Sequence, residues 1–227
     1  MMRRPLLRHP RRQRLWLLLA SIALVPLVRA DAASLAVATQ RLTSHRAASQ
    51  VPPTTCSLAP AADTYVSEDA NASNYGTSTS LLVRSAAGAN RRAVLRFDLS
   101  SCSIPSNASI RTAALRLTLT SPPTVSRTYE VHRASAAWTE DTVTWSTQPS
   151  VAAPATSSAV TGMTAGAIVE WSVKADVEAF VQGMVTNEGW RISDATESES
   201  TALESGFAAR EEATSSSRPI LTVTYYP

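Results

Sequence analysis

The stretch from Trp138 to Trp145 reads WTEDTVTW and places two adjacent carboxylates between two tryptophans. Catalysis by Glu140 and Asp141 is disfavoured, because adjacent strand residues point to opposite faces, whereas glycosidase carboxyl groups flank one bond about 5–9 Å apart. We favour a core hairpin that turns at these acids. A tryptophan that stacks on a ligand ring is the open alternative.

Arginines are concentrated between residues 84 and 133. Arg96 and Arg116 lie on the polar faces of two alternating runs, so they would form a positive stripe if those runs are neighbouring strands. Guanidinium groups pair bidentately with carboxylates and sulfates, which suits an acidic ligand, although a solvated face with scattered ion pairs fits too. Tyr75, Tyr129 and Trp190 are candidate stacking rings. The candidate ligand-binding set is Arg84, Arg92, Arg96, Arg116, Arg133 and Tyr129.

Two further patterns concern metals and catalysis. Asp63, Asp69 and Asn71 supply closely spaced oxygen donors, as a structural calcium site requires, although such residues are also ordinary turn formers. We expect no other cofactor. His132 lies in a strand-like run, and we interpret it as a half-exposed strand histidine rather than as part of a catalytic triad.

The N-terminal segment predicts export. A basic start is followed by an apolar run of 14 residues, Leu15–Val28, and then by small residues, which is typical of a secretory signal peptide over residues 1–32. The run is shorter than the roughly 20 residues of a spanning helix, so a retained signal anchor is the lesser alternative. We expect a secreted, extracellular protein with no membrane span after cleavage.

The charge of the remainder excludes one class of partner. Residues 1–30 hold 7 of the 21 basic residues and no acidic ones, which leaves 14 basic against 18 acidic residues. The basic character therefore belongs to the leader, and nucleic acid is not an expected partner.

Cys56 and Cys102 are the only cysteines, and both follow the predicted leader. In an oxidising compartment an even pair predicts one disulfide, here closing a loop of about 46 residues.

The rest of the sequence predicts an all-β jelly-roll sandwich with one short helix. We expect an Ala/Ser/Thr/Pro-rich tether over residues 33–60 and one domain over 61–227. Period-two alternation is clearest at Leu115, Leu117 and Leu119. Apolar spacing predicts a helix over 176–184 with Asp176 as its N-cap. Strands are expected at 80–84, 93–99, 113–120, 129–133, 142–145, 168–173 and 220–225, and long surface loops at 146–165 and 194–217.

Short tags spread over residues 61–227 also occur together in a known family. They are ADTYV (62–66), NYG (74–76), LLVR (81–84), LRFDLS (95–100), IPSNASI (104–110), AALRL (113–117), WTEDTVTW (138–145), DVEAFV (176–181), EGW (188–190), AARE (208–211) and RPILTVTY (218–225). In this order the chain resembles the DNRLRE domain, also described as carbohydrate-binding module family 96.

This resemblance implies a secreted jelly-roll β-sandwich that binds carbohydrate and is not itself an enzyme. It also implies that Trp138 and Glu140 are structural, and that Arg210 and Glu211 form a salt-bridging pair. Related members bind acidic polysaccharides through basic side chains, so a uronate-rich or sulfated polysaccharide is the expected partner. Arginines would supply that charge here, since Lys174 is the only lysine. The alternative is a structural or adhesive cell-surface or extracellular protein without glycan affinity.

Overall fold

The computed structural model describes residues 51–227, which form eleven strands, one α-helix and four short 3-10 helices. The predicted signal peptide and the predicted tether up to residue 50 lie outside the described residues. The strands are β1 (Thr54–Leu58), β2 (Pro60–Ser67), β3 (Ser80–Ser85), β4 (Arg91–Phe97), β5 (Ser109–Ser121), β6 (Thr128–Arg133), β7 (Ser157–Val160), β8 (Ile168–Ser172), β9 (Trp190–Asp194), β10 (Leu203–Ala208) and β11 (Ile220–Tyr226). The helices are α2 (Lys174–Val181), η1 (Glu68–Ala70), η2 (Leu99–Cys102), η3 (Trp145–Thr147) and η4 (Ser215–Ser217).

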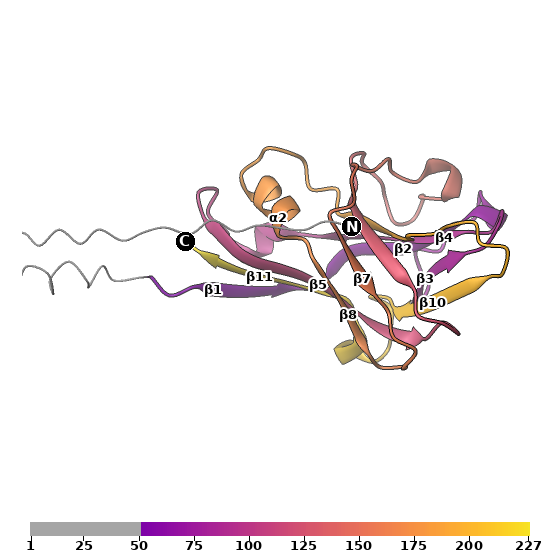
Figure 1. The fold of residues 1–227 in the computed structure, drawn as a ribbon. Helices are drawn as coiled ribbons and strands as arrows, with labels where there is room; N and C mark the ends of the chain where they lie inside the picture. Colours follow the sequence, from indigo (N-terminus) through magenta and orange to yellow (C-terminus); the bar gives the residue numbers. More distant parts are fainter. Residues whose placement is uncertain (1–50) are drawn as a thin grey trace, which may run out of the picture. The chain divides into compact units, whose positions relative to one another are not determined.

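The strands of residues 51–227 form two packed layers (Figure 1). One layer has the order β1-β11-β5-β8, and every pairing in it is antiparallel. The other contains β2, β4, β9, β6 and β7 in that order, with β3 and β10 continuing from β4. The end of β5 pairs with β10 through a bulge at Gly206/Phe207, which curls the whole into one sheet. The all-β sandwich with one short helix is confirmed.

The main core lies between the layers. Its largest fully buried side chains include Trp171, Trp190 and Tyr129. Leu115, Leu117 and their neighbours on the same face of β5 are also buried, as the period-two pattern predicts, while the alternate residues are exposed or half-buried.

A second, smaller apolar cluster covers the outer face of β2 and β4. Val66 and Val94 project from these strands away from the main core and meet Trp138 and Val143. The cluster is therefore covered by the loop of residues 134–150, which contains the WTEDTVTW stretch. Residues of this loop line two of the four hollows at the candidate site.

Several expected element boundaries were wrong. The tether was expected to reach residue 60, yet Thr54–Leu58 forms β1 and pairs with β11. Residues 142–145 form no strand; the segment turns into η3 instead. β7 and β10 form where surface loops were expected, and β9 forms where no element was expected. All three strands are short, and β9 and β10 are largely buried, so they lack the alternation that marks a half-buried strand. No helix within residues 51–227 has the length and apolarity needed to span a bilayer.

The predicted helix forms as α2, but Asp176 does not cap it. The N-cap position is Val173, and Asp176 lies in the first turn. Its carboxylate instead accepts hydrogen bonds from Trp190 Nε1 at 2.8 Å and Thr156 Oγ1 at 2.6 Å. The buried indole N–H of Trp190 requires an acceptor, and Asp176 provides it.

The predicted disulfide is confirmed. Cys56 of β1 and Cys102 at the end of η2 are bonded, with their Cα atoms 5.9 Å apart. β1 is the edge strand of its layer, so the bond fastens that edge to the segment between β4 and β5.

Candidate functional site

The WTEDTVTW stretch is a scaffold, though not the hairpin that was expected. Trp138 is 5% exposed, and its Nε1 donates to the carbonyl oxygen of Glu188 at 2.9 Å. Trp145 is half-buried in η3. The guanidinium groups of Arg96 and Arg92 lie over these rings, 5.6 Å and 4.4 Å from the respective centroids. Each tryptophan thus supports an arginine of β4 by a cation–π contact.

Glu140 is occupied by structural contacts. Its Oε1 accepts a hydrogen bond from the backbone nitrogen of Asp63 at 2.8 Å, and its Oε2 pairs with Arg210 at 2.8 Å. Arg210 also pairs with Glu211 at 2.7 Å, so the expected salt bridge is confirmed and extended by Glu140. Asp141 is exposed. The two adjacent acids thus have different surroundings and do not form a catalytic pair.

Asp63 is the most perturbed acid of the described residues. It is 1% exposed, and burial raises its pKa to about 7, with the charges of Glu211 and Glu140 adding to that rise. A hydrogen bond from the backbone nitrogen of Arg210 to Oδ2 opposes it. Oδ1 is buried and has no hydrogen-bond partner among the described residues.

The raised pKa predicts an unusual pH dependence of stability in metal-free buffer. Because the folded chain holds the Asp63 proton more tightly than the unfolded chain, this group stabilises most at low pH. Its contribution is lost as the pH rises from 3.8 to about 7, by at most about 1.4 kcal/mol per pH unit. Urea unfolding of the wild type and Asp63→Asn at four pH values between 4 and 8 measures this. The difference between their free energies of unfolding should change with pH, and a constant difference would contradict the assignment.

Both ring nitrogens of His132 contact oxygen atoms of neighbouring residues. It lies on β6, where Nδ1 contacts the carbonyl oxygen of Ala152 and Nε2 contacts Glu130, both at 3.2 Å. Its side chain is 16% exposed. The expected place on a strand is confirmed, but the side chain is more buried than the half-exposed histidine that was predicted.

The positive stripe through Arg96 and Arg116 does not form. Arg96 is on β4, which pairs with β2, β3 and β9, whereas Arg116 is on β5, which pairs with β8, β10 and β11. Arg116 instead forms an exposed ion pair with Glu170 at 2.6 Å on the other layer. Sequence periodicity assigns a residue to a face of its own strand but does not say which strands are neighbours.

Most of the other candidate arginines are held by acids. Arg84 pairs with Asp69 at 2.6 Å, and Arg92 forms a two-pronged pair with Glu197. In these side chains the guanidinium charge is already balanced, which fits the alternative of a polar face with ion pairs. A ligand-binding role for them stays a prediction.

Two of the three candidate stacking rings are in the core. Tyr129 and Trp190 are both 0% exposed, and the Tyr129 hydroxyl donates to Ser205 at 2.7 Å. Their predicted stacking on a ligand is therefore wrong. Tyr75 is half-buried and stacks on Tyr65, with ring centroids 4.2 Å apart.

Three hollows adjoin the loop between α2 and β9, and a fourth continues from them along the loop of residues 134–150. The largest, about 450 Å³, is lined by Arg96, Asp98 and Glu188, and a neighbour of about 270 Å³ is lined by Arg133 and Glu188. Two more, of about 320 and 280 Å³, continue at the ends and share lining residues with these. We call the series the 185–189 groove. Thr186, Asn187, Ser100, Ser135, Thr139 and Thr142 also line it.

Arg96 and Arg133 are the two predicted arginines that line the groove. The Nη1 of Arg96 contacts Glu188 at 3.4 Å, and the Nε of Arg133 contacts Asp176 at 3.3 Å. Within residues 51–227 the other guanidinium nitrogens of both side chains have no hydrogen-bond partner. β4 and β6 flank β9, and Arg133 is in register with Trp190 and Leu95. Arg133 and Arg96 therefore project from opposite faces of this layer, and the 185–189 loop lines the hollows of both.

The loop that separates these arginines was missed by sequence reasoning. Gly189 has a φ of +75°, and Asn187 donates to the carbonyl oxygen of Phe97 at 2.8 Å, which fastens the loop to β4. The EGW tag at 188–190 was the available signal, because a glycine before a buried tryptophan marks a tight approach.

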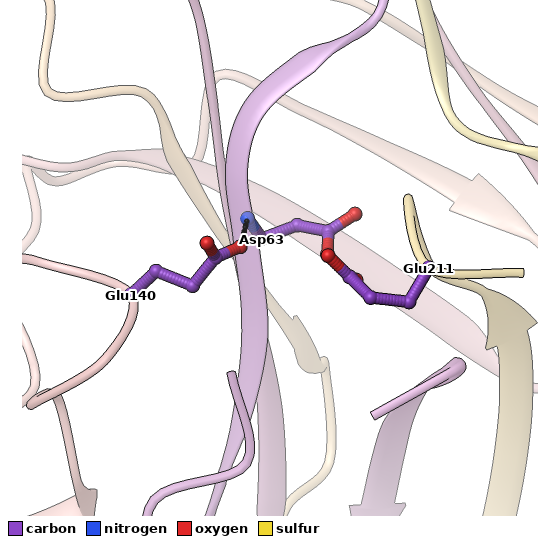
Figure 2. A group of neighbouring side chains, drawn as sticks. All are labelled: Asp63, Glu140 and Glu211. Carbon is purple, nitrogen blue, oxygen red and sulfur yellow. Dashed lines mark hydrogen bonds between the residues drawn. The ribbon is translucent and has the colours of Figure 1, made fainter. Parts of the chain in front are cut away.

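The calcium candidates named from the sequence are not grouped as expected. Asp69 accepts from Ser67 at 2.5 Å and pairs with Arg84, and Asn71 is exposed. Asp63 lies instead with Glu140 and Glu211, with one carboxylate oxygen of each within 4.8 Å of the others (Figure 2).

The comparisons with known proteins agree with this architecture. A search of curated proteins found no match to the chain. The family model of carbohydrate-binding module family 96 matches residues 54–225, from β1 to β11. Membership of such a family supports a binding role rather than a catalytic one. Because the match covers well over half of the sequence, this chain belongs to carbohydrate-binding module family 96.

Proposed function

We propose that this protein is a secreted, non-catalytic carbohydrate-binding module that holds an acidic polysaccharide in the 185–189 groove. The family supports carbohydrate binding in general. The preference for an acidic polysaccharide rests on one observation. Arg96 and Arg133 line adjacent hollows, and each has guanidinium nitrogens without a hydrogen-bond partner among the described residues.

The two arginines suit a chain of anionic sugars. A guanidinium group presents parallel N–H donors that match a carboxylate or sulfate, and such charge-assisted bonds are stronger than neutral ones. Arg96 and Arg133 lie on either side of the 185–189 loop, so a polysaccharide chain that crosses this loop contacts both arginines. The hydroxyl and amide side chains that line the same hollows offer partners for sugar hydroxyls.

Substitution of both arginines tests this site. Arg96→Ala with Arg133→Ala should weaken binding to an acidic polysaccharide by at least about tenfold, since a hydrogen bond to a charged group contributes about 1.5–3 kcal/mol. Affinity electrophoresis against alginate, a sulfated galactan and a neutral glucan, at low and high salt, measures the change. Retention by the acidic polymers should fall at high salt.

Arg116→Ala is the matched control, because it removes an ion-paired arginine from the other layer. It should change affinity less than twofold. Thermal unfolding of all three proteins confirms that the fold is kept. Equal losses in the control and the double variant, or retention by the neutral glucan alone, would refute the acidic-glycan site.

Secretion is the second part of the proposal. The predicted signal peptide at 1–32 would direct export, and the Cys56–Cys102 disulfide fits an oxidising compartment. N-terminal sequencing of the protein recovered outside the cells tests this, and a product that still begins at Met1 would contradict it.

A structural or adhesive role is the second candidate. The observation that favours it is the exposure of apolar side chains near the β7–β8 connection, where Val160, Met163 and Ile168 are 68%, 59% and 64% exposed. Exposed apolar groups of this kind favour protein contacts when they are contiguous. Binding to cells without retention by any polysaccharide would support this role over the first.

A further inference from the structure

We propose that Asp63, Glu140 and Glu211 form a calcium-binding site that joins three distant segments of the chain. Asp63 is on β2, Glu140 on the loop of residues 134–150, and Glu211 just after β10. Figure 2 shows Asp63 between the other two, with its carboxylate toward Glu211 and its backbone nitrogen toward Glu140. This inference is independent of the proposed glycan site.

The distances suit one ion. One carboxylate oxygen from each residue lies within 4.8 Å of the others. Calcium binds oxygen ligands at about 2.3–2.6 Å, so two ligands on opposite sides of the ion are separated by about 5 Å at most. Calcium takes 6–8 oxygen ligands, and backbone carbonyl groups or water would complete the set around these carboxylates.

Two oxygens of the cluster lack partners. Oδ1 of Asp63 and Oε2 of Glu211 are both buried, and neither accepts a hydrogen bond from any described residue. Asp63 is 1% exposed, so its free oxygen is shielded from bulk water. Buried acceptors without a partner are costly, and a bound ion is one of the standard explanations for them.

The charge of the cluster points to a divalent cation. The guanidinium group of Arg210 pairs with Glu140 at 2.8 Å and with Glu211 at 2.7 Å, and it is the one positive charge paired with this cluster of three acids. When all three acids are ionised, two negative charges remain uncompensated around a buried residue. A divalent cation balances these charges, and calcium is preferred to magnesium because the site is irregular and magnesium demands near-ideal octahedral geometry.

Calcium titration of the full chain, after chelator treatment and dialysis, tests the site. Isothermal calorimetry should show one calcium ion bound per chain, with a higher melting temperature in calcium than in chelator and a smaller shift in magnesium. Asp63→Asn and Glu211→Gln should each weaken calcium binding at least tenfold. Both substitutions keep an oxygen that can accept the existing bonds from the Arg210 backbone and side chain.

The control is Asp69→Asn, which removes an acid of η1, directly after β2, that lies outside the cluster. It should bind calcium as the wild type does. Absence of calcium binding by the folded wild type, or equal binding by wild type, Asp63→Asn and Glu211→Gln, would overturn the proposal. In the first case the free oxygens share a proton instead. No glycan is present in these titrations, so a failure of the calcium proposal can be distinguished from a failure of the proposed polysaccharide site.

Discussion

Gly189→Ala is expected to destabilise the domain by about 2–5 kcal/mol. The backbone of Gly189 has a φ of +75°, which costs an L-residue about 1–2 kcal/mol. A Cβ at this position would also lie 2.8 Å from the Cα of Arg96 and would collide with the carbonyl oxygen of Leu95. Both contacts are with the backbone of β4, which cannot move aside as a flexible side chain can, and overpacking of this kind adds about 1–3 kcal/mol.

Urea unfolding of the purified protein measures this loss. Gly183→Ala is the matched control, because Gly183 has a similar φ of +69° but a Cβ there would have no atom within 4 Å. The control should lose only the conformational contribution, about 1–2 kcal/mol. Equal losses in the two variants would mean that the close approach to β4 contributes nothing.

Gly189→Ala should also lower the affinity for an acidic polysaccharide in those molecules that remain folded. Gly189 follows Glu188, whose carbonyl oxygen accepts from Trp138 Nε1, and its own carbonyl oxygen accepts from the backbone nitrogen of Ala134 at 2.9 Å. Displacing Gly189 from β4 therefore moves the loop that separates Arg96 from Arg133. Gly183→Ala, at the end of α2, should leave affinity unchanged.

Reduction of the Cys56–Cys102 disulfide is expected to cost about 4 kcal/mol of stability. The two cysteines are 46 residues apart, and the loss follows from the greater chain entropy of an unfolded state without that loop. β1 is an edge strand that pairs only with β11 within the described residues, so it should detach first. Urea unfolding of the oxidised and reduced forms of the same protein measures the difference without any change of sequence.

Hydrogen exchange distinguishes local from global effects of the reduction. Amides of β1 should exchange faster in the reduced protein, while those of β5, in the centre of the same layer, should remain protected until global unfolding. A Cys56→Ser, Cys102→Ser variant should behave like the reduced form. An unchanged unfolding midpoint would show that the unfolded chain is already compact without the bond.

Sequence patterns alone predicted the class of fold and much of the strand content. Leu115, Leu117 and Leu119 show period-two alternation because one face of β5 is buried and the other is solvated. The same reasoning located β3, β4, β6, β8 and β11, and the cysteine pair predicted the disulfide. The ordered tags, finally, pointed to the family that the chain belongs to.

Where alternation is absent, the sequence pattern failed. The last four residues of β10 are all buried, because β10 lies between β3 and the bulged end of β5. β10 therefore shows no alternation, and its glycine and serine fitted the surface loop that was predicted over residues 194–217. Asp176 was expected at a helix cap, but the indole N–H of Trp190, 14 residues away, needs that carboxylate in the core.

Which residues meet at each site became clear from the three-dimensional packing of the strands and loops. Periodicity could place Arg96 and Arg116 on polar faces, but strand order put them on different layers and brought Arg133 to the groove with Arg96. Glu140 is 77 residues from Asp63, and Glu211 is 148 residues from it, yet the three carboxylates share one cluster. Local patterns reflect how each strand divides between core and solvent. Which strands adjoin, and which loop covers them, depends on packing between segments that are distant in the sequence.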